Sequence, residues 1–569
     1  MGIVYTEIKK KSKYITFTFI IKCFATIVEL IIPLLLSYII DDVIERENIW
    51  EIIFYGCLML LATFLAFISN VIANRMSSRS STEITKEVRK QLYYKVTYLS
   101  EKQVDDVTIP TLVSRLTTDT YNVHQVIGMI QRAGVRGPIM LVGGIFVTLV
   151  ISPMLALILL IALPFITAVS IIASKKGFPK YKLVQKKIDK QVEVVRENIT
   201  GIRVVKALSK TEYEKNRFDE ANMDTIITEK SAAMIMSTVN PIVSLILNTG
   251  LVAVLLFGGY LISEEKLEPG SILGFMLIFN YILNSMLMIT RIFMMISRAS
   301  ASIGRIHEIM ELEEDLKIKS PTYYPGDDYI VFDNVDFSYN GVKNDLTSIN
   351  IKLKKGESLG ILGATGSGKT TLINLLLRLY DPTKGGIYLE GKNINSYDEE
   401  TFRKNFGVVF QNDIVFGDTI KGNIDFFRNL TEEDIKSAVK NSEAKFINEP
   451  EVGLEHEVAS RGLNLSGGQK QRLLIARSMA AKPNILILDD ASSALDYKTD
   501  AALRRNINEN FKDTTLIIVA QRISSIMNCN KIIILDEGRI VDMGTHEELL
   551  KTSKIYQTIS ELQMGAFNE

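Results

Sequence analysis

A glycine-rich run at residues 363–370 has the residue types and the spacing needed to hold a phosphate chain. Its sequence is Gly-Ala-Thr-Gly-Ser-Gly-Lys-Thr, and it lies between a strand-like stretch and a helical one. Glycines let successive backbone N–H groups turn inward around phosphate oxygens, at the positive end of the helix dipole. We therefore expect Lys369 to reach the β- and γ-phosphates and the Thr370 hydroxyl to bind Mg²⁺. An accidental glycine-rich turn would not be expected to have these flanks.

A carboxylate needed for the same chemistry follows about 120 residues later. Ile485–Asp489 has the composition of a buried strand that ends in a carboxylate. Asp489 would hold Mg²⁺ through water, the role of the second acidic element of phosphate-loop ATPases. Such a strand is common by itself, but its pairing with the glycine-rich run predicts a site for ATP and Mg²⁺. The nucleotide-binding residues predicted from the glycine-rich run are Gly363, Thr365, Gly366, Ser367, Gly368, Lys369, Thr370 and Thr371.

A second phosphate grip is predicted between these two elements. Residues 465–472 are Leu-Ser-Gly-Gly-Gln-Lys-Gln-Arg, which places a serine and two glycines at the start of a helix, a grip like that of the first glycine-rich run but without the lysine of that run. With this run the sequence resembles the ABC transporter ATPases, for which it is the signature motif. The resemblance covers essentially the whole chain, because the N-terminal half is similar to a six-helix ABC exporter domain.

The resemblance implies roles for further residues. Tyr339 matches the aromatic residue on which adenine stacks, although such a tyrosine alone is more often an ordinary surface or core residue. Gln411 matches the glutamine that senses Mg²⁺ and the attacking water. Residues 493–496 match the loop that crosses to a partner ATPase. The signature would contact the partner's nucleotide through Ser466, Gly467, Gly468 and Gln469.

Three positions depart from the family pattern. Asp490 stands where the family has a glutamate that polarises the attacking water, and Asp is one methylene shorter, so its reach to that water is reduced. Gln521 replaces the expected histidine, and glutamine can hydrogen-bond the γ-phosphate but carries no charge. Ser460 replaces the usual acidic residue before the signature. The first two changes predict a degenerate catalytic site whose nucleotide-holding parts are intact.

The elements that position these residues fall into two domains. Six apolar segments are long enough to span a bilayer, which needs about 20 residues each. They start near Tyr14, Ile49, Gly134, Met154, Met236 and Ser271. The long gaps after the second and fourth segments are rich in Lys and Arg, whereas the short first and fifth gaps are acidic. The excess of positive charge predicts that the long loops and both termini are cytoplasmic, in a multi-pass plasma-membrane protein.

The long loops carry helical periodicity, so we expect the spanning helices to continue as rods into the cytoplasm. Their tips, predicted as turns at Ser100–Pro110 and Leu208–Tyr213, would touch something below the membrane. After residue 318 the sequence pattern changes to alternating strand-like and helical stretches. The sequence therefore predicts an all-α six-helix transmembrane domain at 1–318, a linker at 319–328 and an α/β ATPase domain at 329–569.

The composition excludes several function classes. Lys plus Arg and Asp plus Glu number 65 each, so nothing suggests a nucleic-acid partner. Six spans argue against a soluble ABC ATPase, and the fusion of both domains favours an exporter over an importer. Three scattered cysteines predict no disulfide framework.

The degenerate site has consequences for assembly. In the family the ATPase domains pair head to tail, so a homodimer of this chain would carry Asp490 and Gln521 in both sites. The resemblance implies a non-identical half-transporter that supplies Glu and His and uses this chain's signature. A slow homodimeric exporter and an ATP-gated regulatory membrane protein are the alternatives.

Polar residues in the apolar segments say little about the cargo. They are Glu29, Asn248, Asn280, Asn284 and Arg291. Such groups are costly in a membrane and face a cavity or a neighbouring helix. Either contacts between helices or contacts with cargo would explain them. A hydrophobic or amphipathic small molecule, a drug or a lipid, is the expected cargo.

Overall fold

The computed structural model describes residues 2–313, 316–449, 452–492 and 494–564. The chain divides into two compact units. The first contains residues 1–98 and 109–312, and the second contains residues 99–108 and 313–569. The ten-residue segment 99–108 therefore belongs with the C-terminal unit, although it lies inside the N-terminal part of the sequence.

The first unit is built from long helices. In order they are α1 (Ile3–Lys10), α2 (Ser12–Tyr38), α3 (Ile49–Thr97), α5 (Ile109–Ser114), α6 (Thr120–Ile151), α7 (Pro153–Thr200), α8 (Ile202–Ala207), α9 (Thr211–Ser237), α10 (Val239–Ser263) and α11 (Pro269–Met310). Short π-helical turns at Ile39–Val43 and Arg115–Asp119 extend α2 and precede α6.

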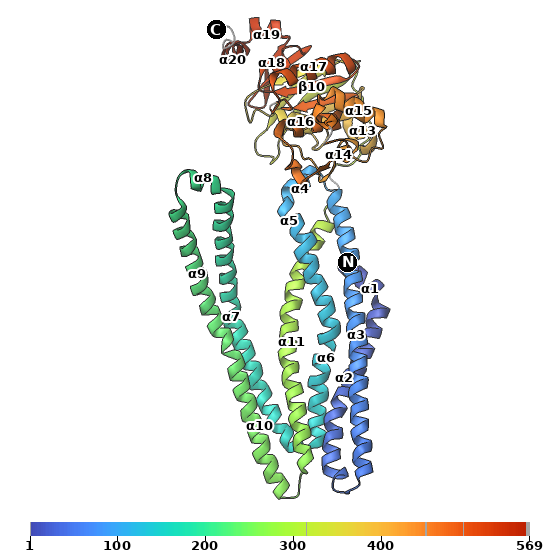
Figure 1. Ribbon diagram of the computed structural model, residues 1–569, viewed down its shortest axis with the longest axis vertical. Helices are drawn as coiled ribbons and strands as arrows, with labels where there is room; N and C mark the ends of the chain where they lie inside the picture. The colour runs from blue at the N-terminus through green and yellow to red at the C-terminus, as the bar shows by residue number, and fades with distance from the viewer. Residues whose placement is uncertain (1, 314–315, 450–451, 493, 565–569) are drawn as a thin grey trace. The chain divides into compact units, whose positions relative to one another are not determined.

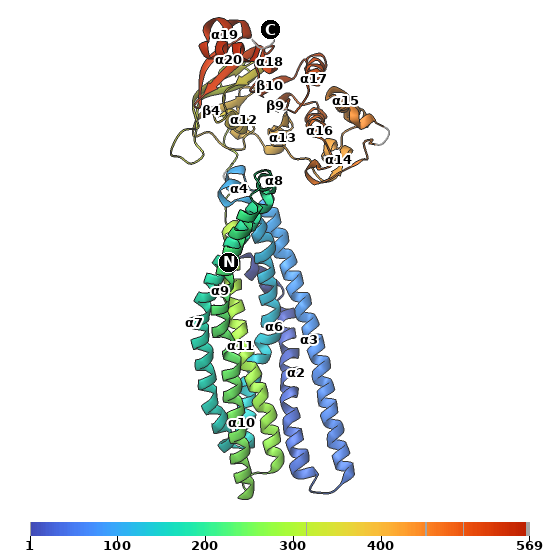
Figure 2. The same ribbon diagram turned by 60° about the vertical axis from the view of Figure 1, so that its left-hand side comes forward.

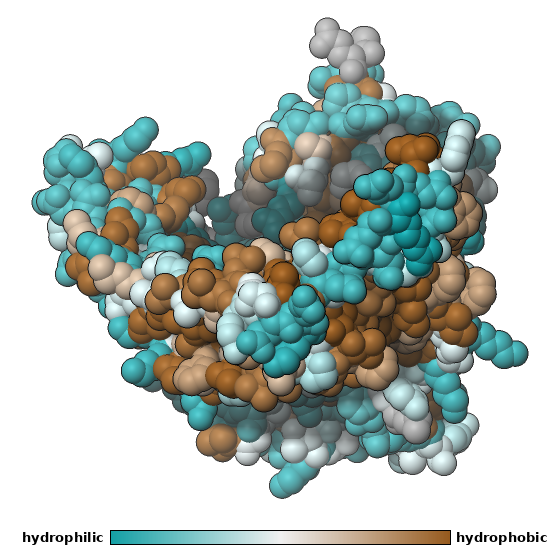
Figure 3. All heavy atoms as spheres, turned by 90° about the horizontal axis from the view of Figure 1, so that it is seen from below, coloured by the Kyte–Doolittle hydropathy of each residue, from teal (hydrophilic) through white to brown (hydrophobic). Residues whose placement is uncertain are grey.

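Within the described ranges, six helical segments are long and apolar enough to cross a membrane, which confirms the predicted number of spans. They extend beyond the length of a bilayer, as predicted for helical rods; α3 alone has 49 residues. Only 6% of the apolar window of that segment is buried within the protein, so the chain's own helices cover little of it. The end-on view in Figure 3 shows apolar side chains spread widely over the visible surface.

Two groups of helices are visible in this unit. Helices α2, α3, α6 and α11 pack as a bundle, while α7, α9 and α10 form an arm that diverges from it (Figure 1). The arm joins the bundle through an apolar cluster that includes Leu155 and Leu159 of α7 and Phe275 and Phe279 of α11. Figure 2 shows the same helices from another side.

A buried ion cluster fixes α11 to the turn before α6. Asp119 is 1% exposed and accepts hydrogen bonds from Ser302 Oγ at 2.8 Å and from Arg305 Nε at 3.0 Å. Arg115 Nη1 donates to the same carboxylate at 3.2 Å. Nothing in the sequence singled out this cluster, because its members are spread over nearly 200 positions.

The tips of the rods differ from each other. The predicted turn at Ser100–Pro110 contains the helix α4 (Glu101–Val107), so the expectation of a simple turn was wrong there. A capping box explains the helix: Ser100 Oγ accepts from Gln103 N, and the Gln103 side chain accepts from Ser100 N. At the other tip, α8 ends at Ala207 and α9 begins at Thr211, with Ser209 in the left-handed region at φ 55°.

The second unit is an α/β domain with two principal sheets. The four-stranded antiparallel sheet has the order β2-β1-β4-β5, and the six-stranded sheet has the order β12-β11-β3-β10-β9-β6. The strands are β1 (Ile330–Phe337), β2 (Leu346–Leu353), β3 (Ser358–Leu362), β4 (Lys384–Leu389), β5 (Lys392–Asn393), β6 (Phe406–Val409), β9 (Ile485–Asp489), β10 (Thr515–Ala520), β11 (Lys531–Asp536) and β12 (Arg539–Gly544). A small third sheet pairs β7 (Asp418–Thr419) with β8 (Glu457–Val458).

The helices of this unit complete the α/β fold, as predicted. They are α12 (Lys369–Leu376), α13 (Glu399–Arg403), α14 (Ile420–Asp425), α15 (Glu432–Asn441), α16 (Gly467–Met479), α17 (Tyr497–Asn510), α18 (Ile523–Ile526), α19 (His546–Thr552) and α20 (Lys554–Met564). Strand β9 is buried at all five positions, which its run of Ile and Leu explains. The predicted strands Ser358–Leu362 and Ile485–Asp489 have the observed bounds of β3 and β9.

Candidate functional site

Three neighbouring parallel strands gather the predicted site residues at one edge of the large sheet. Strands β3, β10 and β9 lie side by side, with Ala520 opposite Leu362 and Val519 opposite Asp489. The carboxyl ends of parallel strands are where α/β proteins bind ligands. The glycine-rich loop follows β3, the pair Asp489-Asp490 ends β9, and Gln521 follows β10. Gln411 comes two residues after β6, which pairs with β9.

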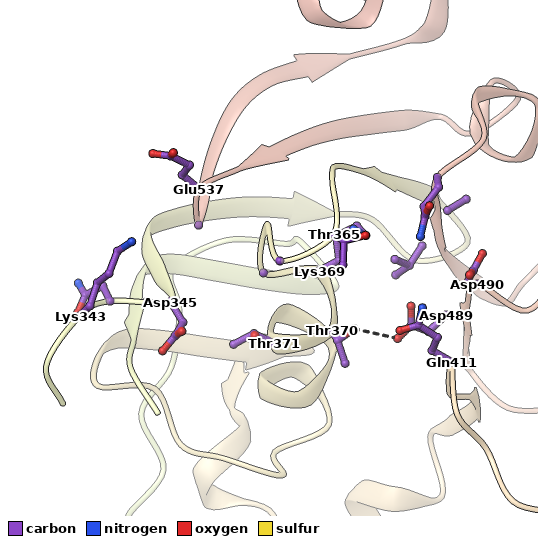
Figure 4. Close-up of a pocket in the computed structure, with 17 residues that line it drawn as sticks. Lys343, Asp345, Thr365, Lys369, Thr370, Thr371, Gln411, Asp489, Asp490 and Glu537 are labelled. Carbon is purple, nitrogen blue, oxygen red and sulfur yellow. Dashed lines mark hydrogen bonds between the residues drawn. The ribbon is translucent and has the colours of Figure 1, made fainter. Parts of the chain in front are cut away.

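A cavity of about 420 Å³ opens at this edge, within the range of small-ligand pockets. Figure 4 shows Lys343, Asp345 and Glu537 at one end and Gln411, Asp489 and Asp490 at the other. The residues that line it are Lys343, Asn344, Asp345, Thr365, Gly366, Gly368, Lys369, Thr370, Thr371, Gln411, Asp489, Asp490, Val519, Ala520, Gln521, Glu537 and Gly538.

The glycines of the loop serve its geometry. Gly366 and Gly368 have φ of 83° and 102°, the left-handed region that glycine adopts without strain. A Cβ on Gly363 would lie 2.3 Å from the Leu535 carbonyl oxygen, so no side chain fits there. Gly363 and Ser367 do not line the cavity; Ser367 is buried at 4% exposure beneath the loop. These residues shape the cradle, whereas residues 365, 366 and 368–371 face the cavity.

Lys369 provides the positive charge of the cradle. Its Nζ donates to the carbonyl oxygens of Gly363 and Ala364 at 2.8 and 2.7 Å, so the ammonium group lies against the loop. Burial lowers the pKa of Lys369, while the charges of Asp489 and Asp490 act in the opposite direction. A half-buried ammonium beside backbone N–H groups at a helix N-terminus suits a polyphosphate.

Asp489 and Thr370 form the candidate Mg²⁺ position. Thr370 Oγ1 donates to Asp489 Oδ2 at 3.3 Å, the contact drawn in Figure 4. Asp489 is 2% exposed. Burial raises the pKa of Asp489, and the charge of the nearby Asp490 raises it further, although the hydrogen bond from Thr370 and the charge of Lys369 lower it. Hydroxyl, carboxylate and the Gln411 amide oxygen are hard oxygen ligands, the set that Mg²⁺ prefers. The residues therefore fit ATP with Mg²⁺.

The two departures from the family pattern lie in this same cavity. Asp490 has φ 51°, and its backbone N–H donates to Val519 O at 3.0 Å, which holds the turn after β9. Gln521 is exposed, and its backbone carbonyl oxygen accepts a hydrogen bond from Gln563 Nε2 of α20 at 2.8 Å. Both side chains border the space that Lys369 and Thr370 also line.

The signature residues lie outside this cavity. Ser466 caps α16: its Oγ accepts from Gln469 N at 3.3 Å, and its own N–H donates to Gln469 Oε1 at 2.9 Å. A Cβ on Gly468 would be 3.3 Å from Ala494 O, which places the signature beside the predicted crossing loop. Ser493 of that loop lies outside the described residues. The two predicted phosphate grips therefore lie at separate places on the chain.

Tyr339 lies next to the cavity without lining it. Its hydroxyl donates to Thr371 Oγ1 at 3.4 Å, and its ring meets those of Phe337 and Tyr380 edge-on at 4.8 and 5.1 Å. Tyr339 is 42% exposed, which leaves part of the residue accessible to a ligand.

Sequence reasoning missed the end of the cavity formed by Lys343, Asp345, Glu537 and Gly538. One signal was present: Glu537-Gly538 is a turn dipeptide after β11, with Gly538 at φ 76°. Asp345 has a structural task, since its Oδ2 accepts from the Tyr339 backbone N–H at 2.9 Å.

Replacing Lys369 with Ala is expected to weaken ATP binding by about ten- to a hundredfold, since a charged hydrogen-bond donor to phosphate is lost. Equilibrium binding of a trinitrophenyl ATP analogue to the purified chain measures this. Because the pKa of Lys369 is lowered, the affinity of the wild-type chain for ATP should fall as pH rises. The fall should begin at a lower pH than it would if Lys369 had the pKa of an exposed lysine. Lys343→Ala, at the opposite end of the cavity, is the control. Equal losses from both variants would contradict the role given to Lys369.

Both parts of the chain match known protein families. Residues 15–286 match the profile described as ABC transporter transmembrane region, and residues 346–493 match the profile described as ABC transporter. The uncharacterized ABC transporter ATP-binding protein YfiB of Bacillus subtilis is 32% identical over 541 residues, 95% of this chain and 94% of the relative. YknU of the same organism, also an uncharacterized ABC transporter ATP-binding protein, is 34% identical over 479 residues, 83% of this chain and 82% of the relative.

The fold is also found among solved structures. A bacterial Atm1-family ABC exporter with ATP bound superposes with a TM-score of 0.80 at 20% identity, over 98% of each chain. The fold class, six apolar helices followed by an α/β nucleotide-binding domain, is therefore confirmed. The chain belongs to the ABC transporter family and joins the family's transmembrane region to an ATP-binding domain that uses ATP with Mg²⁺.

Proposed function

We propose that this chain is one half of an asymmetric ABC exporter that moves hydrophobic or amphipathic compounds out across the plasma membrane. The observation that carries the proposal is the composition of the ATP cavity: Asp490 and Gln521 line it together with an intact Lys369, Thr370 and Asp489. Such a site is built to hold ATP with Mg²⁺ and poorly built to hydrolyse it.

The chemistry of the two residues supports this. A general base must lie within hydrogen-bond reach of the attacking water, and a displacement of about 1 Å has large effects on rate. Asp490 is one methylene shorter than the glutamate of the family pattern. Gln521 can donate a hydrogen bond to the γ-phosphate but supplies no positive charge. A non-identical partner with Glu and His would complete a working site with Ser466 and Gly468 of this chain.

ATP in the site lined by Asp490 would then hold the two ATPase domains together, while hydrolysis at the other site resets the transporter. The basic composition of the long loops supports a cytoplasmic location for the tips, the ATPase domain and both termini. The apolar stretches of the long helices support a bilayer location for those stretches.

Helix α4 is the candidate link between ATP and the membrane helices. The Tyr380 hydroxyl donates to Asp105 of α4, and Gln103 Nε2 donates to Glu313 O at 2.6 Å. Burial and the hydrogen bond to Asp105 raise the pKa of Tyr380, so the phenol keeps its proton. The ring of Tyr380 also touches Tyr339, which lies beside the cavity. A movement around the nucleotide thus has a packed route to α4.

Asp105→Ala is expected to lower the amount of cargo transported per ATP hydrolysed by about fivefold, because one hydrogen bond that anchors α4 is lost. The measurement is uptake into inverted vesicles divided by ATP turnover in the same vesicles. Asp106→Ala changes the neighbouring exposed carboxylate and serves as the control. An unchanged ratio in the Asp105 variant would show that the contact between Asp105 and Tyr380 does not couple ATP hydrolysis to transport.

The asymmetric proposal is tested by comparing Asp490→Ala with Glu→Ala at the equivalent position of the co-expressed partner. Only the partner substitution is expected to abolish ATP turnover. Equal damage from both would show that Asp490 is catalytic. Purifying this chain alone tests the homodimer, since full cargo-stimulated hydrolysis without a partner would refute the need for one. ATP-dependent accumulation in inverted vesicles separates an exporter from a regulatory protein, which should show none.

A further inference from the structure

A polar cavity lies among the membrane helices. It has a volume of about 470 Å³ and is formed by α6 and α11. The residues that line it are Met129, Ala133, Arg136, Met140, Tyr281, Asn284, Ser285, Met288, Arg291 and Ile292. Its size lies in the range that holds a small molecule, and its mixture of apolar and polar groups suits an amphipathic one.

The charges on this cavity have one sign. Arg136 and Arg291 contribute guanidinium groups, and no carboxylate is among the described residues that line it. The charge of Arg136 is neutralised by Glu29, which does not line the cavity. Arg136 Nε and Nη2 lie 3.1 and 3.0 Å from Glu29 Oε2. Glu29 is held in turn by Asn70 Nδ2 at 2.6 Å.

Arg291 has no such counterpart. Within the part of the chain that the structure describes, no carboxylate lies within ion-pair distance of it. Lys22, which is 4% exposed, belongs to the Glu29 group instead, because it donates at 2.5 Å to the amide oxygen of Asn70. Uncompensated cations inside spanning helices are costly and mark a pathway or a binding site.

The two arginines lie at different depths along their helices. Arg136 lies 15 residues before the end of α6 at Ile151, or about 22 Å along the helix axis. The hydrocarbon core is about 30 Å thick, so Arg136 falls within that length. Arg291 lies 22 residues after the start of α11 at Pro269, about 33 Å along the axis, and therefore at the boundary of the core. Asn284 and Tyr281, one turn apart on α11, add neutral polar groups beside the two arginines. The guanidinium fork binds carboxylates, phosphates and sulfonates through paired hydrogen bonds.

We infer that this cavity binds the anionic head group of an amphipathic cargo, with Arg291 as the main contact and Arg136, fixed by Glu29, as the second. The methionine and isoleucine side chains of the same cavity would receive the apolar body. The inference rests on the proposed export function and narrows it: the preferred cargo carries a carboxylate, phosphate or sulfonate, and lipophilic cations are poor ligands.

The experiment measures equilibrium binding of two radiolabelled probes to the full-length chain, purified with its partner in a neutral detergent. Taurocholate is the amphipathic anion and tetraphenylphosphonium is the lipophilic cation. Saturable binding of taurocholate is expected to weaken about tenfold in Arg291→Gln, since one charged hydrogen-bond donor is lost, and to be largely retained in Arg291→Lys.

Arg298→Gln is the matched control, because Arg298 is exposed on the same helix seven residues later and does not line the cavity. It should leave taurocholate binding unchanged. Unchanged binding in Arg291→Gln, or tetraphenylphosphonium binding that is stronger than that of taurocholate, would overturn the inference. Binding needs no ATP, so the two proposals fail separately. Charge-selective binding without ATP-driven transport would refute export and keep the site.

Discussion

Ser466→Ala in the assembled transporter is expected to reduce ATP turnover by about a hundredfold, the size of effect found when one phosphate- or oxyanion-binding donor is removed. Ser466 is the N-cap of α16, where its hydroxyl and the following backbone N–H groups would form the predicted phosphate grip. In the proposed pair this grip belongs to the partner's working site, so the loss should be far greater than that from Asp490→Ala. The measurement is phosphate release at saturating ATP.

The control must separate catalysis from helix capping, because Ser466 also closes a capping box with Gln469. Loss of such a cap costs about 1 kcal/mol of stability. Thr545 forms the same kind of box with Glu548 at the start of α19 and does not line the ATP cavity. Thr545→Ala should therefore lower stability alone. Similar turnover in the two variants would mean that the signature of this chain serves no working site.

Asp119→Ala is expected to destabilise the membrane unit by about 1.5–3 kcal/mol, the range for hydrogen bonds to charged groups, because Arg305 is 38% exposed and solvent screens the guanidinium that remains. The carboxylate is 1% exposed and receives hydrogen bonds from Arg305, Ser302 and Arg115. Its removal leaves the guanidinium groups of Arg115 and Arg305 without the carboxylate that both contact. Unfolding of the purified chain in mixed micelles with increasing dodecyl sulfate measures the change.

Glu83 provides the comparison for this experiment. It pairs with Lys11 and Arg79 at 2.7 and 3.0 Å, but its side chain is 39% exposed. Solvent screens such pairs, so Glu83→Ala should change stability little. If both variants unfold alike, the Asp119 cluster contributes no more than a surface pair. The effect should appear without any change in ATP affinity, since Asp119 lies in the other compact unit from Lys369.

The sequence was sufficient wherever function rests on local backbone geometry. The loop from Gly363 to Thr371 and the strand ending at Asp489 could be predicted because glycine spacing and a buried apolar run each specify one local structure. The six spans followed from apolar length alone. The roles of Asp490, Gln521 and the signature came from the family resemblance, and they stay predictions.

The remaining features depend on contacts between distant residues, which no local pattern records. The pairing of Asp105 with Tyr380 joins positions 275 residues apart, and that of Asp119 with Arg305 joins positions 186 apart. Lys343 and Glu537 reach the cavity only because the loop after β1 and the turn after β11 meet there. Arg291 was noticed as a costly charge, but its place in a cavity with Arg136 depends on how α6 packs against α11.

The assignment of residues 99–108 to the C-terminal unit has a practical meaning for recombining such transporters. The backbone passes between the two units three times, at 98–99, 108–109 and 312–313, so the ATPase unit is not a detachable module. A chimera made by exchanging residues 329–569 alone would place a foreign surface against the native α4. Exchanging α4 together with the ATPase domain, so that Asp105 and Tyr380 come from one parent, is the graft that preserves their contact.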